Sequence, residues 1–143
     1  MTDGSTGRAT VVVANPDPTV CEVLARVVEG AGHEAVRVTD PLQITPGVLS
    51  APADALVLDL GPGNVAQLRS LRGGDHPRAT QCRVVVISTG PASSLLEWQA
   101  DADAVITRPF RAEELQAALG EAIARLPQDR TATRLAHIEA LHP

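Results

Sequence analysis

Residues 55–63 read ALVLDLGPG, an apolar run that ends in one carboxylate, Asp59, and a sharp turn. A short continuous apolar run is typical of a strand that a parallel sheet buries on both faces. Ligands of such open α/β sheets bind in the crevice at the carboxyl ends of the strands, which is where this pattern places Asp59. An acidic side chain is costly inside a sheet, which favours a functional role. The position alone is equally compatible with a residue that starts the turn or caps the next helix.

Apolar strands and amphipathic helices alternate on both sides of this run. The expected strands are residues 9–14, 34–38, 53–59, 83–88 and 103–107. The expected helices are residues 18–31, 64–71, 92–99 and 112–126, with a short or broken helix in the proline-rich segment 39–53 and a loop over 73–77. Five strands that alternate with helices predict an α/β fold with a mostly parallel sheet and right-handed crossovers.

The length of 143 residues favours one domain with a single core. We expect a flexible N-terminus over residues 1–7, a folded domain over 8–126 and a C-terminal tail or linker over 127–143. Pro127 is expected to end the globular unit, and residues 132–141 have the pattern of one more short helix.

Composition excludes several classes of function. The net charge of −5 and the lack of a dense basic stripe argue against nucleic acid as a partner. No stretch approaches the ~18 apolar residues of a membrane span, and the N-terminus has no apolar signal region. The two cysteines, Cys21 and Cys82, are too few and too distant for a disulfide framework or a zinc site. These features predict a cytoplasmic protein without a membrane partner.

Two more segments complete a recognisable pattern. Residues 87–90 read Ile-Ser-Thr-Gly at the end of the fourth expected strand, and residues 101–110 read DADAVITRPF around the fifth. Together with the run that ends in Asp59, they resemble the receiver domain of two-component response regulators over about residues 8–126. The resemblance implies the flavodoxin-like fold of the chemotaxis receiver, a doubly wound five-stranded parallel sheet with strand order 2-1-3-4-5.

The same resemblance implies roles for particular residues. Asp59 would accept a phosphoryl group from a histidine kinase, and Mg²⁺ would bridge the aspartate and the phosphoryl group. Thr89 and Arg108 would stabilise the transferred group. Arg108 stands where the family has a lysine, Arg108–Pro109 is a candidate cis peptide, and Gly61 would lend its carbonyl to the metal. Such a protein is not an enzyme beyond transfer onto its own aspartate.

The chain departs from the family where the metal is held. Two adjacent acids are replaced by Asn15 and Pro16. Asp17 is a weak substitute as a metal ligand. Its position directly before Pro18 is better explained as the N-cap of the next helix. Mg²⁺ binding is therefore expected to be poor. Without a competing metal, Arg108 can pair with Asp59 and lock the site in one state.

The resemblance also implies an interaction face over residues 92–99, 103–107 and 112–126, the usual dimer surface of the family. The residues assigned to it are Trp98, Val105, Phe110 and Arg111. Trp98 is a candidate partner anchor, whereas Phe110 is expected in the core under the last helix. Val105 replaces the aromatic residue that reports phosphorylation in the family. A homodimer through this face is expected.

Two functions remain open at this stage. One is a receiver that accepts a phosphoryl group on Asp59 in a two-component phosphorelay. The other is a phosphorylation-independent module that binds a histidine kinase, another signalling protein or a second copy of itself. An enzyme or flavin carrier on the same fold has little support, because aromatic residues are almost absent and no nucleophile–base pair is evident.

Overall fold

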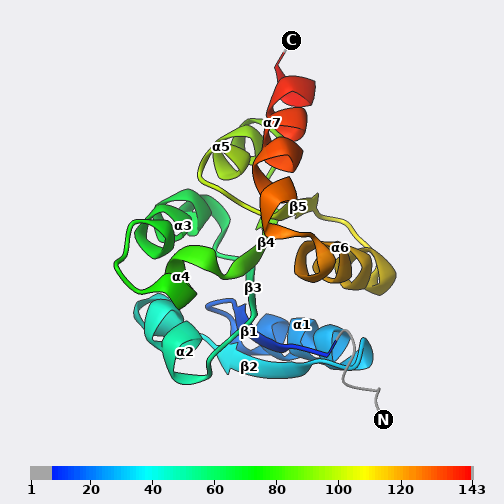
Figure 1. Ribbon diagram of the computed structural model, residues 1–143. Helices are drawn as coiled ribbons and strands as arrows, with labels where there is room; N and C mark the ends of the chain where they lie inside the picture. The colour runs from blue at the N-terminus through cyan, green and yellow to red at the C-terminus, as the bar shows by residue number, and fades with distance from the viewer. Residues whose placement is uncertain (1–7, 143) are drawn as a thin grey trace.

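The computed structural model describes residues 8–142 (Figure 1), so the predicted flexible N-terminus, residues 1–7, lies outside the described residues. Five parallel strands form one sheet in the order β2-β1-β3-β4-β5, as predicted. The strands are β1 (Thr10–Ala14), β2 (Glu34–Val38), β3 (Ala55–Leu58), β4 (Arg83–Ser88) and β5 (Ala104–Thr107). Within the described residues, no helix is long and apolar enough to span a bilayer.

Helices cover both faces of the sheet (Figure 1). One face carries α1 (Pro18–Gly30) and α6 (Ala112–Ala124), and the other carries α2 (Ile44–Ser50), α3 (Asn64–Arg72), α4 (Pro77–Gln81) and α5 (Pro91–Gln99). Short 3-10 turns η1 (Pro41–Gln43) and η2 (Gly61–Gly63) precede α2 and α3, so the proline-rich segment is a broken helix as predicted. The sequence pattern missed α4, because five residues are too few to show helical periodicity.

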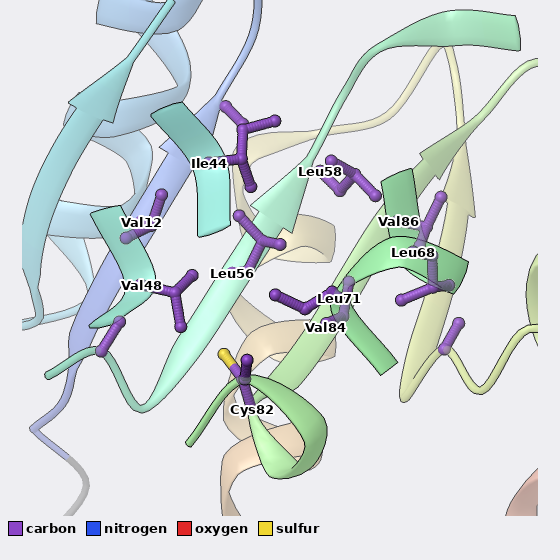
Figure 2. Packing of buried hydrophobic residues seen from close by; sticks show 14 of the residues in the cluster. Val12, Ile44, Val48, Leu56, Leu58, Leu68, Leu71, Cys82, Val84 and Val86 are labelled. Atoms are coloured by element: carbon purple, nitrogen blue, oxygen red, sulfur yellow. The ribbon is translucent and has the colours of Figure 1, made fainter. Parts of the chain in front are cut away.

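Alternate residues of the central strands fill two separate cores. Val12 and Leu56 point to the side of α2 and α3, whereas Val13 and Val57 pack against α1 and α6. Figure 2 shows the first of these cores, with Val12 of β1 near Val48 of α2 and Val86 of β4 beside Leu68 of α3. Because β3 is buried on both faces, its apolar run is continuous rather than alternating.

The register of the strands brings distant loops to one edge. Leu58 pairs with Ala14 of β1 and Val86 of β4, and the backbone N–H of Asp59 donates to the carbonyl of Ala14 (3.0 Å). Ser88 pairs with Thr107 of β5. The residues that follow β1, β3, β4 and β5 therefore meet at the carboxyl edge of the sheet.

The C-terminal segment contains the short helix expected over residues 132–141, and the structure shows where this helix lies. After the turn η3 (Pro127–Asp129), helix α7 (Arg130–Leu141) packs against α5, and Ile138 contacts the core that contains Trp98. The imidazole of His137 stacks on the Trp98 indole at 4.1 Å between ring centroids and 5° between ring planes. Helix α7 is therefore an integral layer over α5, which Figure 1 shows at the top of the molecule.

Candidate functional site

An ion pair occupies the carboxyl edge of the sheet. Arg108 donates from Nη1 to Asp59 Oδ1 (2.9 Å) and from Nη2 to Asp59 Oδ2 (2.6 Å). The carboxylate is 5% exposed, whereas the Arg108 side chain is 49% exposed. Two parallel bonds to a planar guanidinium form a strong and geometrically specific pair. Hydrogen bonding to Asp59 raises the pKa of Arg108 above its ordinary value.

Asn15 completes the shell around this carboxylate. Its Nδ2 donates to Asp59 Oδ2 (2.6 Å), and its Oδ1 accepts the backbone N–H of Asp17 (2.7 Å). This second bond fixes the orientation of the amide, so that Asn15 presents its NH₂ group to Asp59. Asp59 thus accepts three hydrogen bonds, and Oδ2 receives two of them.

The fold explains how these three residues meet. Asn15 and Asp59 follow the neighbouring strands β1 and β3. Arg108 follows β5, on the far side of β4, and its long side chain reaches back across the end of β4. The Arg108–Pro109 peptide is cis, as the resemblance to receiver domains implies. The Phe110 ring lies under the guanidinium carbon at 5.8 Å and adds a cation–π contact.

Thr89 is near the end of β4, but its hydroxyl is engaged elsewhere. Thr89 Oγ1 pairs with Ser93 Oγ in α5 (2.8 Å). The structure therefore joins Asp59 and Arg108 directly, as predicted, and gives Thr89 a local partner instead.

The side chain of Asp17 caps α1, the better of the two interpretations from the sequence. Its Oδ1 accepts the backbone N–H groups of Thr19 (2.9 Å) and Val20 (3.4 Å). Gly61 begins η2 with a φ of 61°, a conformation that favours glycine, and its carbonyl accepts the N–H of Asn64.

These residues do not fit a magnesium ion. Mg²⁺ is normally held through carboxylate charge in octahedral oxygen coordination. Asp59 is the one carboxylate at the centre of the site, and both of its oxygens already accept hydrogen bonds. Pro16 has no ligand atom, and Asp17 is used as a cap. Within residues 8–142, no group of three or more His, Cys, Asp or Glu side chains is placed to hold a metal.

A buried polar network beneath the site was missed by the sequence analysis. Asn64 Oδ1 accepts the N–H of Leu60, directly after Asp59, and Asn64 Nδ2 donates to Glu97 Oε2 (3.1 Å). Glu97 Oε1 has no hydrogen-bond partner among the described residues. Burial raises the pKa of Glu97 above its ordinary value, although hydrogen bonds from Ser88 and Asn64 oppose the change. The sequence holds no signal for this network, because Glu97 lies within an ordinary amphipathic helix.

The expected interaction face is largely occupied by the chain itself. Trp98, the candidate anchor for a partner, is 5% exposed because α7 covers it. Val105 packs against the same core, and Phe110 packs under α6 as predicted. Arg111 precedes α6, and its backbone N–H donates to the Glu114 carboxylate (2.9 Å).

An apolar groove lies beside the ion pair. It has a volume of about 380 Å³ and runs between α1 and the loop that follows β5. Val20, Val23 and Val27 form one wall, and Pro109 and Phe110 form the other. Val23 is 58% exposed. The groove thus places an accessible apolar surface next to Arg108.

No protein-family model and no curated protein matches the sequence. Solved structures do match the fold. A putative response regulator from Chloroflexus aurantiacus J-10-fl is 24% identical, with a TM-score of 0.73 over 82% of this chain and 99% of that one. A sensor protein from Polaromonas sp. JS666 is 23% identical, with a TM-score of 0.69 over 80% and 94%.

The receiver domain of a sensor histidine kinase from Pseudomonas aeruginosa PAO1 is 16% identical, with a TM-score of 0.69 over 82% of this chain and 98% of that one. That protein has a magnesium ion coordinated in its active site cleft. At these identities, the matched structures show the fold of the chain. The chain therefore has the α/β, flavodoxin-like fold of response-regulator receiver domains.

Proposed function

We propose that this chain is a receiver domain of two-component signalling that acts by protein contact, with Asp59 held in a permanent ion pair rather than used as a phosphoacceptor. The observation that carries the proposal is the set of three donors on Asp59, two from Arg108 and one from Asn15. The receiver fold supports the signalling role. The three hydrogen bonds to Asp59 favour a module that works without phosphorylation over a phosphoacceptor.

The chemistry of phosphoryl transfer explains why these contacts matter. A carboxylate oxygen must approach in line with the phosphorus atom, and a metal normally neutralises the charge that develops there. Here both oxygens accept charge-assisted hydrogen bonds, and the residues around them do not fit Mg²⁺. An incoming phosphoryl group would have to displace Arg108 from a buried carboxylate and would find no metal to replace the lost charge.

A second function rests on the exposure of Arg108. Its side chain is half exposed, so the guanidinium has room to swing toward solvent and then bind a phosphoryl group on Asp59. In that case the chain is a metal-poor phosphoacceptor that receives its phosphoryl group from a histidine kinase.

Partners follow from the same geometry. We infer that a histidine kinase or another signalling protein binds across the apolar groove between Val23 and Phe110, beside the locked ion pair. A homodimer through the opposite, α5-containing face would have to accommodate α7, which covers Trp98.

Phosphoryl uptake distinguishes the two functions. The protein is incubated with acetyl phosphate and Mg²⁺, and its intact mass is measured. We expect no mass gain for the natural sequence, because Asp59 is held and the metal is not bound. A triple variant, Asn15→Asp, Pro16→Asp and Arg108→Lys, returns the family pattern and should gain one phosphoryl group.

Asp59→Asn in the triple variant is the control and should abolish that gain. Uptake by the natural sequence that disappears in Asp59→Asn would overturn the phosphorylation-independent role and establish the second function.

A further inference from the structure

A polar cavity of about 630 Å³ opens at the edge of the sheet where the strands begin, opposite to Asp59. The turn before β3, helix α4, the start of β4 and the turn before α7 form its walls. Its basic side chains are Arg78, Arg83 and Arg130, together with His76, and Asp54 is the single carboxylate among the described residues that line it. The volume is in the range of small-molecule sites.

Backbone contacts fix the two arginines that carry free donors. Arg83 donates from Nη1 to two carbonyl groups at the C-terminal end of α6 (2.8 and 2.6 Å). Arg78 donates from Nη1 to two carbonyl groups of the turn before β3 (3.2 and 3.3 Å). The other N–H groups of both guanidinium groups have no hydrogen-bond partner within residues 8–142. Each arginine is therefore held by one nitrogen and keeps the rest of its donors available.

The charge around the cavity is not balanced. Arg130 is paired with the buried Asp103, outside the cavity, and Asp54 Oδ2 already accepts the N–H of Thr10 (3.0 Å). Burial is the main cause that lowers the pKa of Arg83, and the neighbouring Arg130 adds to it. An anion would relieve this repulsion. The patch is positive although the whole chain has a net charge of −5.

Two neighbouring groups, His76 and Cys82, are also compatible with a bound anion. His76 Nδ1 accepts the backbone N–H of Arg78 (3.1 Å), so the proton of the neutral ring is on Nε2, which can donate. Burial raises the pKa of Cys82 to about 12, so its thiol stays neutral and contributes no negative charge. Figure 2 shows Cys82 before β4, beneath Val84.

We propose that this cavity binds a phosphate-bearing small molecule, with the phosphoryl oxygens paired to Arg78 and Arg83 and a further hydrogen bond from His76. The guanidinium fork matches phosphate geometry and binds it in bidentate fashion. The cavity exceeds the size of one phosphate ion, and Pro77, Pro127 and Ala53 give it an apolar wall. This combination suits a nucleotide-sized phosphate ester or a diphosphate. The site is at the opposite edge from Asp59 and does not depend on the proposed function.

Calorimetric titration of the full chain at constant ionic strength tests the proposal. The probes are pyrophosphate, adenosine 5′-monophosphate and uncharged adenosine. We expect saturable binding of pyrophosphate, the monophosphate or both, with a Kd below about 1 mM, and no comparable binding of adenosine. Arg78→Gln and Arg83→Gln should each weaken binding by about tenfold or more, because each removes a charged hydrogen-bond donor.

Arg69→Gln is the matched control, since Arg69 is an exposed arginine of α3 outside the cavity, and it should leave the affinity unchanged. Circular dichroism checks that each variant is folded. If Arg83→Gln unfolds because α6 loses its cap, the exposed Arg78→Gln decides the question. The proposal is wrong if neither phosphate probe saturates, if adenosine binds as tightly as its monophosphate, or if Arg69→Gln weakens binding as much as the cavity variants.

Discussion

Replacing Asp103 by asparagine should remove a large part of the stability of this protein. Asp103 is 1% exposed and lies directly before β5. It accepts five hydrogen bonds, from Arg72, Arg130 twice, Arg134 and the backbone N–H of Val84, at 2.8 to 3.1 Å. This carboxylate therefore joins α3 and α7 to the start of the sheet.

The expected loss follows from what the substitution leaves behind. Asp103→Asn keeps the shape of the side chain but leaves three largely buried arginines without their shared counter-charge. Removing one partner of a buried ion pair costs about 3–5 kcal/mol. The free energy of unfolding of a domain is only about 5–15 kcal/mol, so the variant should be marginal.

Urea denaturation measures this loss directly. Trp98 is the single tryptophan of the chain and lies against α7, so its fluorescence reports the unfolding of this region. Glu22→Gln is the control. Glu22 also binds two arginines, Arg26 and Arg37, but its side chain is 40% exposed, so the loss should be small. A loss below about 1 kcal/mol for Asp103→Asn, the range of exposed pairs, would refute the assigned role.

The pH dependence gives a second test of the same carboxylate. Burial would raise the pKa of Asp103, but hydrogen bonds from Arg130 and the other partners hold it below its ordinary value. A depressed pKa contributes stability above the unfolded value of about 3.9, and this contribution is lost as the pH falls through the folded value. The free energy of unfolding should therefore fall more steeply below about pH 4 in the natural protein than in Asp103→Asn.

Three further predictions concern other parts of the molecule. Asn15→Ala should lower the free energy of unfolding by about 1–2 kcal/mol, measured in urea, because Asp59 loses a donor at a buried oxygen; no loss would mean that the bond is not formed. Burial raises the pKa of Glu97, so stability should decline as the pH rises through that folded value, and Glu97→Gln should flatten the decline in thermal unfolding. An equal slope in both proteins would contradict it. Arg134→Glu should detach α7 by repulsion from Asp103 and shift Trp98 emission to the red, whereas unchanged emission would show that α7 stays docked without this contact.

Much of the site was accessible from the sequence because it follows the ends of strands. The carboxyl ends of parallel strands meet at one edge, so the pairing of Asp59 with Arg108 was predictable once the strands were identified. The cap at Asp17 was also predictable, because the signal is local and lies next to Pro18. The engagement of Thr89 by Ser93 was not, since it depends on which rotamer α5 leaves available.

By itself, the sequence determined the alternation of strands and helices, the five-stranded parallel sheet and the place of Asp59 at its edge. Hydrophobic periodicity carries this information, because it records which face of each element is buried. Only the tertiary structure decided that the helix expected in the tail docks on α5 and that Asp103 is its anchor. The partners Arg72, Arg130 and Arg134 are 31, 27 and 31 residues away from Asp103. The position of a charged residue in the sequence does not indicate which residue it will pair with. Its hydrogen bonds form only when folding brings the atoms within about 3 Å.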